Sequence, residues 1–80
     1  MLLPTGKLHR RSSIKAIRDA ISACQRELYA EYDRSGKIGN RTPKDMNDAY
    51  SVALKECYRD ARRHAGTKVP EVEKLFPKES

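Results

Sequence analysis

The chain has 80 residues, of which 38% are hydrophobic, so it can form one domain with a thin core, and domains of this size often depend on a disulfide, a metal or a partner subunit. Its 17 Lys and Arg against 11 Asp and Glu give a net charge of +6, which favours polyanionic partners without defining one. No apolar run in the sequence approaches the roughly 18 residues that span a membrane, which argues against a membrane protein.

The first residues do not form a secretion signal, because Pro4 interrupts Met1-Leu2-Leu3 before these residues could form its apolar core. We therefore expect a soluble, cytoplasmic protein that is not secreted. Cys24 and Cys57 are too few for the disulfide framework of a small secreted protein, and cytoplasmic thiols stay reduced. The sequence thus predicts two small core residues that stay thiols in a reducing compartment, and it leaves their redox state open.

Residues 1–12 show no sustained apolar period and contain Pro4 and Gly6, which favours an N-terminal arm that is flexible or only loosely docked. The arm is basic and carries Arg10 and Arg11 near its end. Two interpretations remain open: a disordered terminus without a role, or an arm that contacts a polyanion.

A first helix is expected from Ser12 or Ser13, either of which can cap it, to about Arg34. Apolar residues recur along it at spacings of three and four, which is typical of one buried face; they are Ile14, Ile17, Ile21, Cys24 and Leu28. The same helix places cations along a second stripe, about a third of a turn away; this stripe includes Arg11, Lys15, Arg18 and Arg26.

Residues 35–42 are rich in glycine and predict a loop between antiparallel helices. A second helix is expected over Pro43–Ala65, since Thr42 can serve as its N-cap, Pro43 suits the first turn and Gly66 can end it.

The fold class that these patterns predict is all-α. Residues 13–66 form an antiparallel two-helix hairpin, with Ile21 expected near Cys57, and residues 67–80 form a tail with a short docked helical turn between Pro70 and Phe76. Pairing of two hairpins into a four-helix homodimer is an open option, because the core of one copy is small.

Neither metal binding nor catalysis is favoured by the spacing of the reactive residues. Cys57 and His64 are seven residues apart on one helix, which separates their backbones by about 10 Å, too far to share a metal or a proton. We therefore expect no cofactor, no metal and no enzymatic activity.

The tyrosines Tyr29, Tyr32 and Tyr50 should gather near the loop. A platform on which bases stack is one interpretation, and a rim around the core is the favoured one.

The informative feature is the position of the cations. An antiparallel hairpin brings the start of the first helix beside the end of the second, and so concentrates Arg and Lys from both halves of the chain at the open end. The predicted phosphate-binding residues are Arg10, Arg11, Lys15, Arg18, Arg26, Lys55, Arg59, Arg62, Arg63 and Lys68.

The sequence therefore predicts a small basic protein that binds DNA or RNA mainly through phosphate contacts. The alternative is an adaptor or inhibitor that docks on an acidic or apolar surface of a larger protein, through residues such as Leu2, Leu3, Leu75 or Phe76. A protein encoded by a virus or a mobile element could act in either way.

Overall fold

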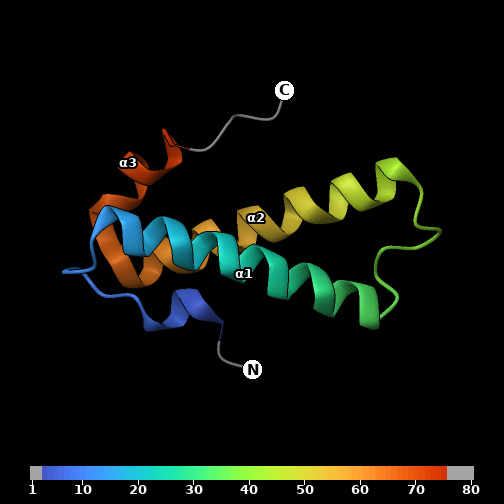
Figure 1. Ribbon diagram of the computed structural model, residues 1–80, viewed down its shortest axis with the longest axis horizontal. Coiled ribbons are helices and arrows are strands. Elements are labelled where there is room, and N and C mark those ends of the chain that lie inside the picture. Colours follow the sequence, from blue (N-terminus) through green and yellow to red (C-terminus); the bar gives the residue numbers. More distant parts are fainter. Residues whose placement is uncertain (1–2, 76–80) are drawn as a thin grey trace.

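A computed structural model of the chain describes residues 3–75. These residues form an all-α fold in which the two long helices pack antiparallel, as the sequence predicts (Figure 1). The elements, in chain order, are the 3₁₀ turn η1 (Pro4–Lys7), the helices α1 (Ile14–Arg34) and α2 (Pro43–Ala65), the 3₁₀ turn η2 (Gly66–Lys68) and the short helix α3 (Val69–Glu73). Within the described range no helix is long and apolar enough to cross a membrane.

The ends of both long helices follow from their capping residues. The Ser13 hydroxyl accepts a hydrogen bond from the Ala16 amide at 3.1 Å, and the Thr42 hydroxyl accepts one from the Asp45 amide at 3.1 Å. Each cap satisfies an amide that has no partner inside the helix. Gly66 ends α2 with a φ of 71°, a conformation that side chains with a Cβ rarely adopt. The predicted helix boundaries are confirmed.

The main core lies between α1, α2 and α3 at the open end of the hairpin. Alanines on α2 let the two long helices approach closely, and larger side chains from α1 and α3 fill the space around them. The buried residues of this core are Ile17, Ile21, Cys24, Cys57, Ala61, Ala65, Val69 and Val72.

Cys24 and Cys57 form a disulfide between α1 and α2, with their Cα atoms 5.9 Å apart. The structure thus has a disulfide in place of the thiols expected for a reducing compartment, and both residues are fully buried in the core as expected. Cys24, rather than Ile21, lies opposite Cys57, which shifts the helix pairing by about one turn. Because both cysteines lie on the buried faces of antiparallel helices, this shift brings their sulfur atoms together.

A second, smaller cluster lies towards the loop and includes Tyr32, Ile38 and Ala53. Nearby, the rings of Tyr29 and Tyr50 meet edge to face with their centroids 5.5 Å apart. The expected gathering of tyrosines is confirmed, and Tyr32 is buried in this cluster.

The N-terminal segment is more ordered in structure than the sequence indicates. η1 packs against both α1 and α2, and the side chain of Thr5, a residue of η1, is fully buried. Figure 1 shows η1 and α3 on opposite sides of the helical pair. Turns with Pro and Gly carry no periodic signal, so this contact could not be predicted from the sequence.

The predicted turn in the tail is α3, which begins one residue before Pro70 and is held by the fully buried Val69 and Val72. Leu75 is 54% exposed. The alternative docking residues Leu2 and Phe76 lie outside the described residues.

Candidate functional site

The open end of the hairpin brings together segments that are far apart in the sequence. The Lys68 ammonium group donates a hydrogen bond to the Ser12 carbonyl at 2.9 Å, and a Cβ added to Gly66 would lie 3.7 Å from Cγ of Arg10. The start of α1 and the end of α2 are therefore neighbours (Figure 1). We call the cations around this junction the basic end: Arg10, Arg11, Lys15, Arg18, Arg59, Arg62, Arg63 and Lys68.

Some cations of the basic end have partners. Arg62 pairs with Glu73 at 3.0 Å, Arg18 approaches Asp19 at 3.9 Å, and Lys68 is half-buried against the Ser12 carbonyl. The other predicted phosphate-binding residues are exposed and form no ion pair within residues 3–75; they are Arg10, Arg11, Lys15, Arg26, Lys55, Arg59 and Arg63. Most of the predicted set thus presents uncompensated positive charge to solvent.

A larger share of the basic residues near the loop have an interaction partner than of those at the basic end. Arg34 pairs with Glu31 and Arg41 pairs with Asp33. Lys37 stacks over the Tyr32 ring, with Nζ 4.3 Å from the ring centroid. The two ends of the hairpin therefore differ in how much of their basic charge is already neutralised.

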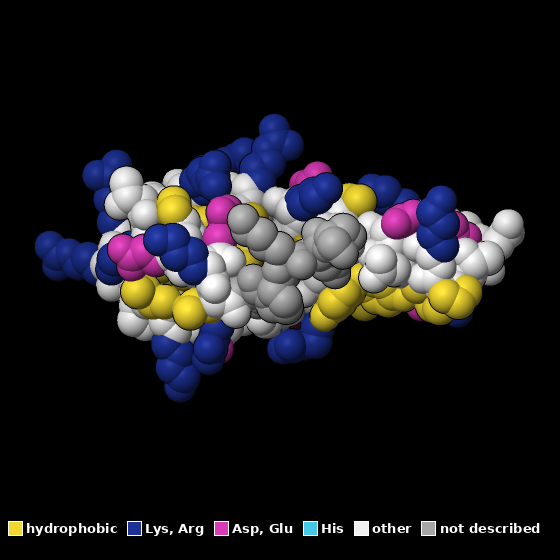
Figure 2. Space-filling view, turned by 90° about the horizontal axis from the view of Figure 1, so that it is seen from above, with side chains coloured by type: hydrophobic (Ala, Val, Ile, Leu, Met, Phe, Trp, Pro, Cys, Tyr) yellow, Lys and Arg dark blue, Asp and Glu magenta, His cyan; other side chains and the backbone are white. Residues whose placement is uncertain are grey.

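The predicted residues do not form a single flat surface. Arg26 follows Cys24 by two residues, and Lys55 precedes Cys57 by two residues. Both therefore lie near the disulfide, in the middle of the hairpin rather than at its end. Figure 2 shows Lys and Arg side chains that project in several directions around the basic end, with Asp and Glu side chains among them. The arrangement suits a partner that wraps around the end or contacts it at several separate points.

A groove between α2 and α3 is lined on one wall by three of the predicted residues. Lys55, Arg59 and Arg62 follow each other at spacings of four and three along α2, and Tyr58 and Glu73 complete a groove of about 290 Å³. Burial raises the pKa of Tyr58 to about 12, and the nearby negative charge of Glu73 adds to this shift. The place of Glu73 in this groove could not be predicted from the sequence, because the predicted turn in the tail had no predicted register against the second helix.

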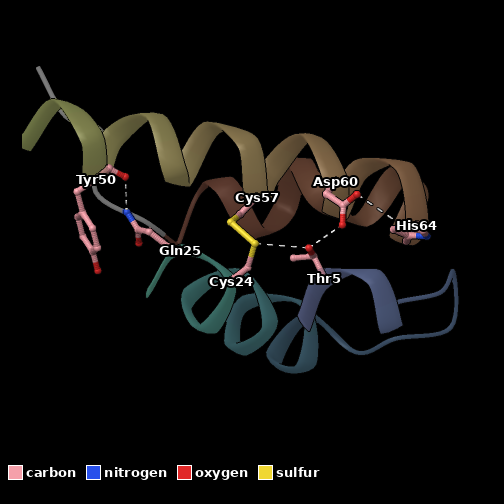
Figure 3. The surroundings of a disulfide bond; sticks show 7 residues. All are labelled: Thr5, Cys24, Gln25, Tyr50, Cys57, Asp60 and His64. Carbon is pink, nitrogen blue, oxygen red and sulfur yellow. Dashed lines mark hydrogen bonds and ion pairs between the residues drawn. A yellow bond between two sulfur atoms is a disulfide. The ribbon is translucent and has the colours of Figure 1, made fainter. Parts of the chain in front are cut away.

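Asp60 lies at the centre of a polar cluster on the other side of the hairpin (Figure 3). One carboxylate oxygen accepts a hydrogen bond from the Thr5 hydroxyl at 2.7 Å, and the other lies 3.7 Å from Nε2 of His64. The Thr5 oxygen also lies 3.6 Å from the Cys24 sulfur, but the short contact to a carboxylate is the stronger interaction for its single proton. Asp60 therefore fixes η1 to α2.

The described residues contain no group of three or more His, Cys, Asp or Glu side chains that could hold a metal ion. Cys57, which could have served as a metal ligand as a thiolate, is part of the disulfide.

No family model, curated protein or solved structure matches the chain, so its function has to be inferred from its residues and their arrangement.

Proposed function

We propose that the chain binds nucleic acid through the phosphate backbone, with the basic end as the contact surface. The observation that supports this proposal is the juxtaposition of α1 and α2, which surrounds one end of the molecule with exposed cations that have few carboxylate partners. Guanidinium groups can hold two phosphate oxygens at once, and each neutralised phosphate releases counterions, which strengthens binding at low salt.

The placement of the cations on α1 adds to this argument. Arg62 and Arg63 lie at the end of α2, where positive charge is favourable because of the helix dipole. Lys15 lies in the first turn of α1, where the dipole disfavours cations, and Arg18 lies just beyond that turn, where the dipole gives a cation no benefit. Helix stability therefore accounts for the first pair but not for the second, and a polyanionic partner accounts for both.

The test is a titration of labelled single-stranded and duplex DNA and RNA with the purified protein at two or more salt concentrations. We expect affinity for duplex DNA to fall by roughly 0.9 log units per log unit of salt for each phosphate neutralised, with little dependence on base sequence. An affinity that does not change with salt would rule the proposal out.

A matched pair of double variants locates the contact surface. Arg10→Gln with Arg59→Gln removes two charges from the basic end, and Lys37→Gln with Lys44→Gln removes two exposed charges near the loop. We expect the first variant to weaken binding at least tenfold and to reduce the salt slope by about two units, one per lost contact. The second variant should change both quantities much less.

The alternative is an adaptor or inhibitor that docks on a larger protein. Large hydrophobic side chains that remain exposed favour it, among them Tyr50 at 39%, Val52 at 41% and Leu75 at 54% exposure. A partner that is retained after nuclease treatment, and is lost more readily with Leu75→Ala than with the arginine variants, would support this alternative over nucleic-acid binding.

Two further proposals concern the state of the protein in the cell. A homodimer remains a prediction, and light scattering of the purified protein tests it. The cytoplasm also remains a proposal, and the Cys24–Cys57 disulfide weighs against it, because disulfides persist mainly in oxidising compartments. Trapping of free thiols in cell extracts distinguishes the two environments.

A further inference from the structure

The groove between α2 and α3 combines a row of cations with one carboxylate from a different element. Lys55, Arg59 and Arg62 are exposed along one side of α2 and span about 10 Å of the helix axis. Glu73 reaches them from α3, and its carboxylate lies 3.0 Å from the Arg62 guanidinium. A carboxylate and a phosphate oxygen bind the same donors of an arginine.

Glu73 is held at this position by the packing of α3. Val69 and Val72 are fully buried in the main core, so they anchor the short helix directly before Glu73. Glu71 lies on the same helix, is exposed and forms no ion pair within the described part of the chain. The two carboxylates have the same charge, but only Glu73 contacts Arg62 and lines the groove beside Tyr58.

We propose that the α2–α3 groove binds one phosphate group of the nucleic acid, and that Glu73 occupies the arginine until this phosphate displaces it. This inference rests on the proposed function and names one of its contact sites. The groove volume of about 290 Å³ can admit a phosphate group. The Arg62–Glu73 pair is exposed, with 63% and 43% of the two side chains accessible, so the interaction is weak enough for a ligand to displace.

The test compares Glu73→Gln with Glu71→Gln in binding to a labelled duplex DNA at fixed salt. Both variants remove one negative charge from α3 and so share any long-range electrostatic effect on affinity. Only Glu73→Gln releases Arg62, and an exposed ion pair of this kind corresponds to a change in affinity of up to about fivefold. We expect Glu73→Gln to bind more tightly than Glu71→Gln by this factor.

A second background separates the effect on Arg62 from any other effect of Glu73. In Arg62→Gln protein, Glu73→Gln and Glu71→Gln should have equal effects, because no arginine remains to be released. The spectrophotometric pKa of Tyr58 in the free protein provides an independent measurement of the position of Glu73: Glu73→Gln should lower this pKa, because the charge of Glu73 helps to raise it, and Glu71→Gln should change it less. Thermal melts of all variants check that α3 stays docked.

The outcomes are distinct. Equal tightening by Glu73→Gln and Glu71→Gln, in protein that binds DNA, would overturn this inference and leave the proposed function intact. A difference between the two variants that persists in Arg62→Gln protein would also overturn it. Absence of binding by every form at low salt would overturn the proposed function, and the inference with it.

Discussion

Thr5 links the N-terminal segment to the hairpin through a single buried hydroxyl group. It is fully buried, and its hydroxyl donates a hydrogen bond to the Asp60 carboxylate at 2.7 Å. A hydrogen bond to a charged group contributes more to stability than one between neutral groups, and the loss of one buried partner leaves the other with a desolvation cost.

Thr5→Val keeps the shape of this side chain and removes its hydrogen bond. We expect the free energy of unfolding to fall by about 1–3 kcal/mol, measured by urea denaturation. Thr67→Val is the control, because Thr67 is exposed in η2 and should change stability by less than about 0.5 kcal/mol. Equal effects of the two substitutions would show that Thr5 does not anchor η1.

Ionisation of Tyr58 should lower the free energy of unfolding at alkaline pH. Burial and the charge of Glu73 raise its pKa from 10.0 to about 12. The neutral phenol is therefore favoured in the folded state, whereas in the unfolded chain the side chain ionises at the lower pKa. Its contribution to the free energy of unfolding is complete below pH 10.0 and is lost as the pH rises to about 12.

The measurement is a series of urea denaturations between about pH 9 and pH 12 on the wild type and on Tyr58→Phe. Lysines titrate in the same range, so the difference between the two proteins is the informative quantity. We expect the free energy of unfolding of the wild type to fall relative to that of Tyr58→Phe as the pH rises. A difference that stays constant across this range would contradict the raised pKa.

At the scale of elements, the cap of α2 is the feature that the sequence marks most clearly. The Thr42 hydroxyl accepts a hydrogen bond from the Asp45 amide at 3.1 Å, and Thr42 is itself exposed. Thr42→Ala should therefore cost about 1 kcal/mol of stability through the loss of the cap alone. Thermal denaturation followed by circular dichroism tests this, with Thr67→Ala as the matched exposed control. Replacement by Ser at position 42 should retain most of the stability.

The elements that could be predicted from sequence are those with a local signal. The bounds of α1 and α2 follow from Ser13, Thr42 and Gly66 together with the apolar period, and these are interactions within a few residues. η1 could not be predicted, because the Thr5–Asp60 contact joins residues 55 positions apart and neither residue lies in a recognisable motif. Contacts of this kind depend on the packed structure.

The candidate site also combines features that could be predicted from the sequence with features that depend on the packed structure. That the basic end forms at all follows from antiparallel pairing, which the loop length and the two apolar faces indicate. Which cations remain without a carboxylate partner could not be predicted, because this depends on the position of α3. Glu73 on α3 forms an ion pair with Arg62, while Arg59 and Arg63 form no ion pair within residues 3–75. The pairing of Cys24 with Cys57 required a shift of about one helical turn from the predicted alignment.

For the whole molecule, the Cys24–Cys57 disulfide is the main constraint beyond the small core. The two cysteines are 33 residues apart, and closing a loop of this length stabilises a folded chain by about 3–4 kcal/mol in the chain-entropy model. Since the core contains few large side chains, this is a substantial part of the stability expected for a domain of this size.

Reduction should therefore lower the melting temperature markedly. We expect a fall of more than about 10 °C on addition of reductant to the oxidised protein, measured by circular dichroism. Protein with Cys24→Ala and Cys57→Ala should melt at a low temperature that reductant does not change. Two free thiols in protein purified without reductant would show that the bond does not form.

The cross-link between α1 and α2 has a consequence for cleavage of the backbone. The loop contains Lys37 and Arg41, both exposed and both substrates for trypsin, and it lies between the two cysteines. A cut there would produce two polypeptides that still migrate as one species on a non-reducing gel. Cleavage of the loop thus leaves α1 and α2 joined by the disulfide, and only reduction of this bond would let the two polypeptides separate.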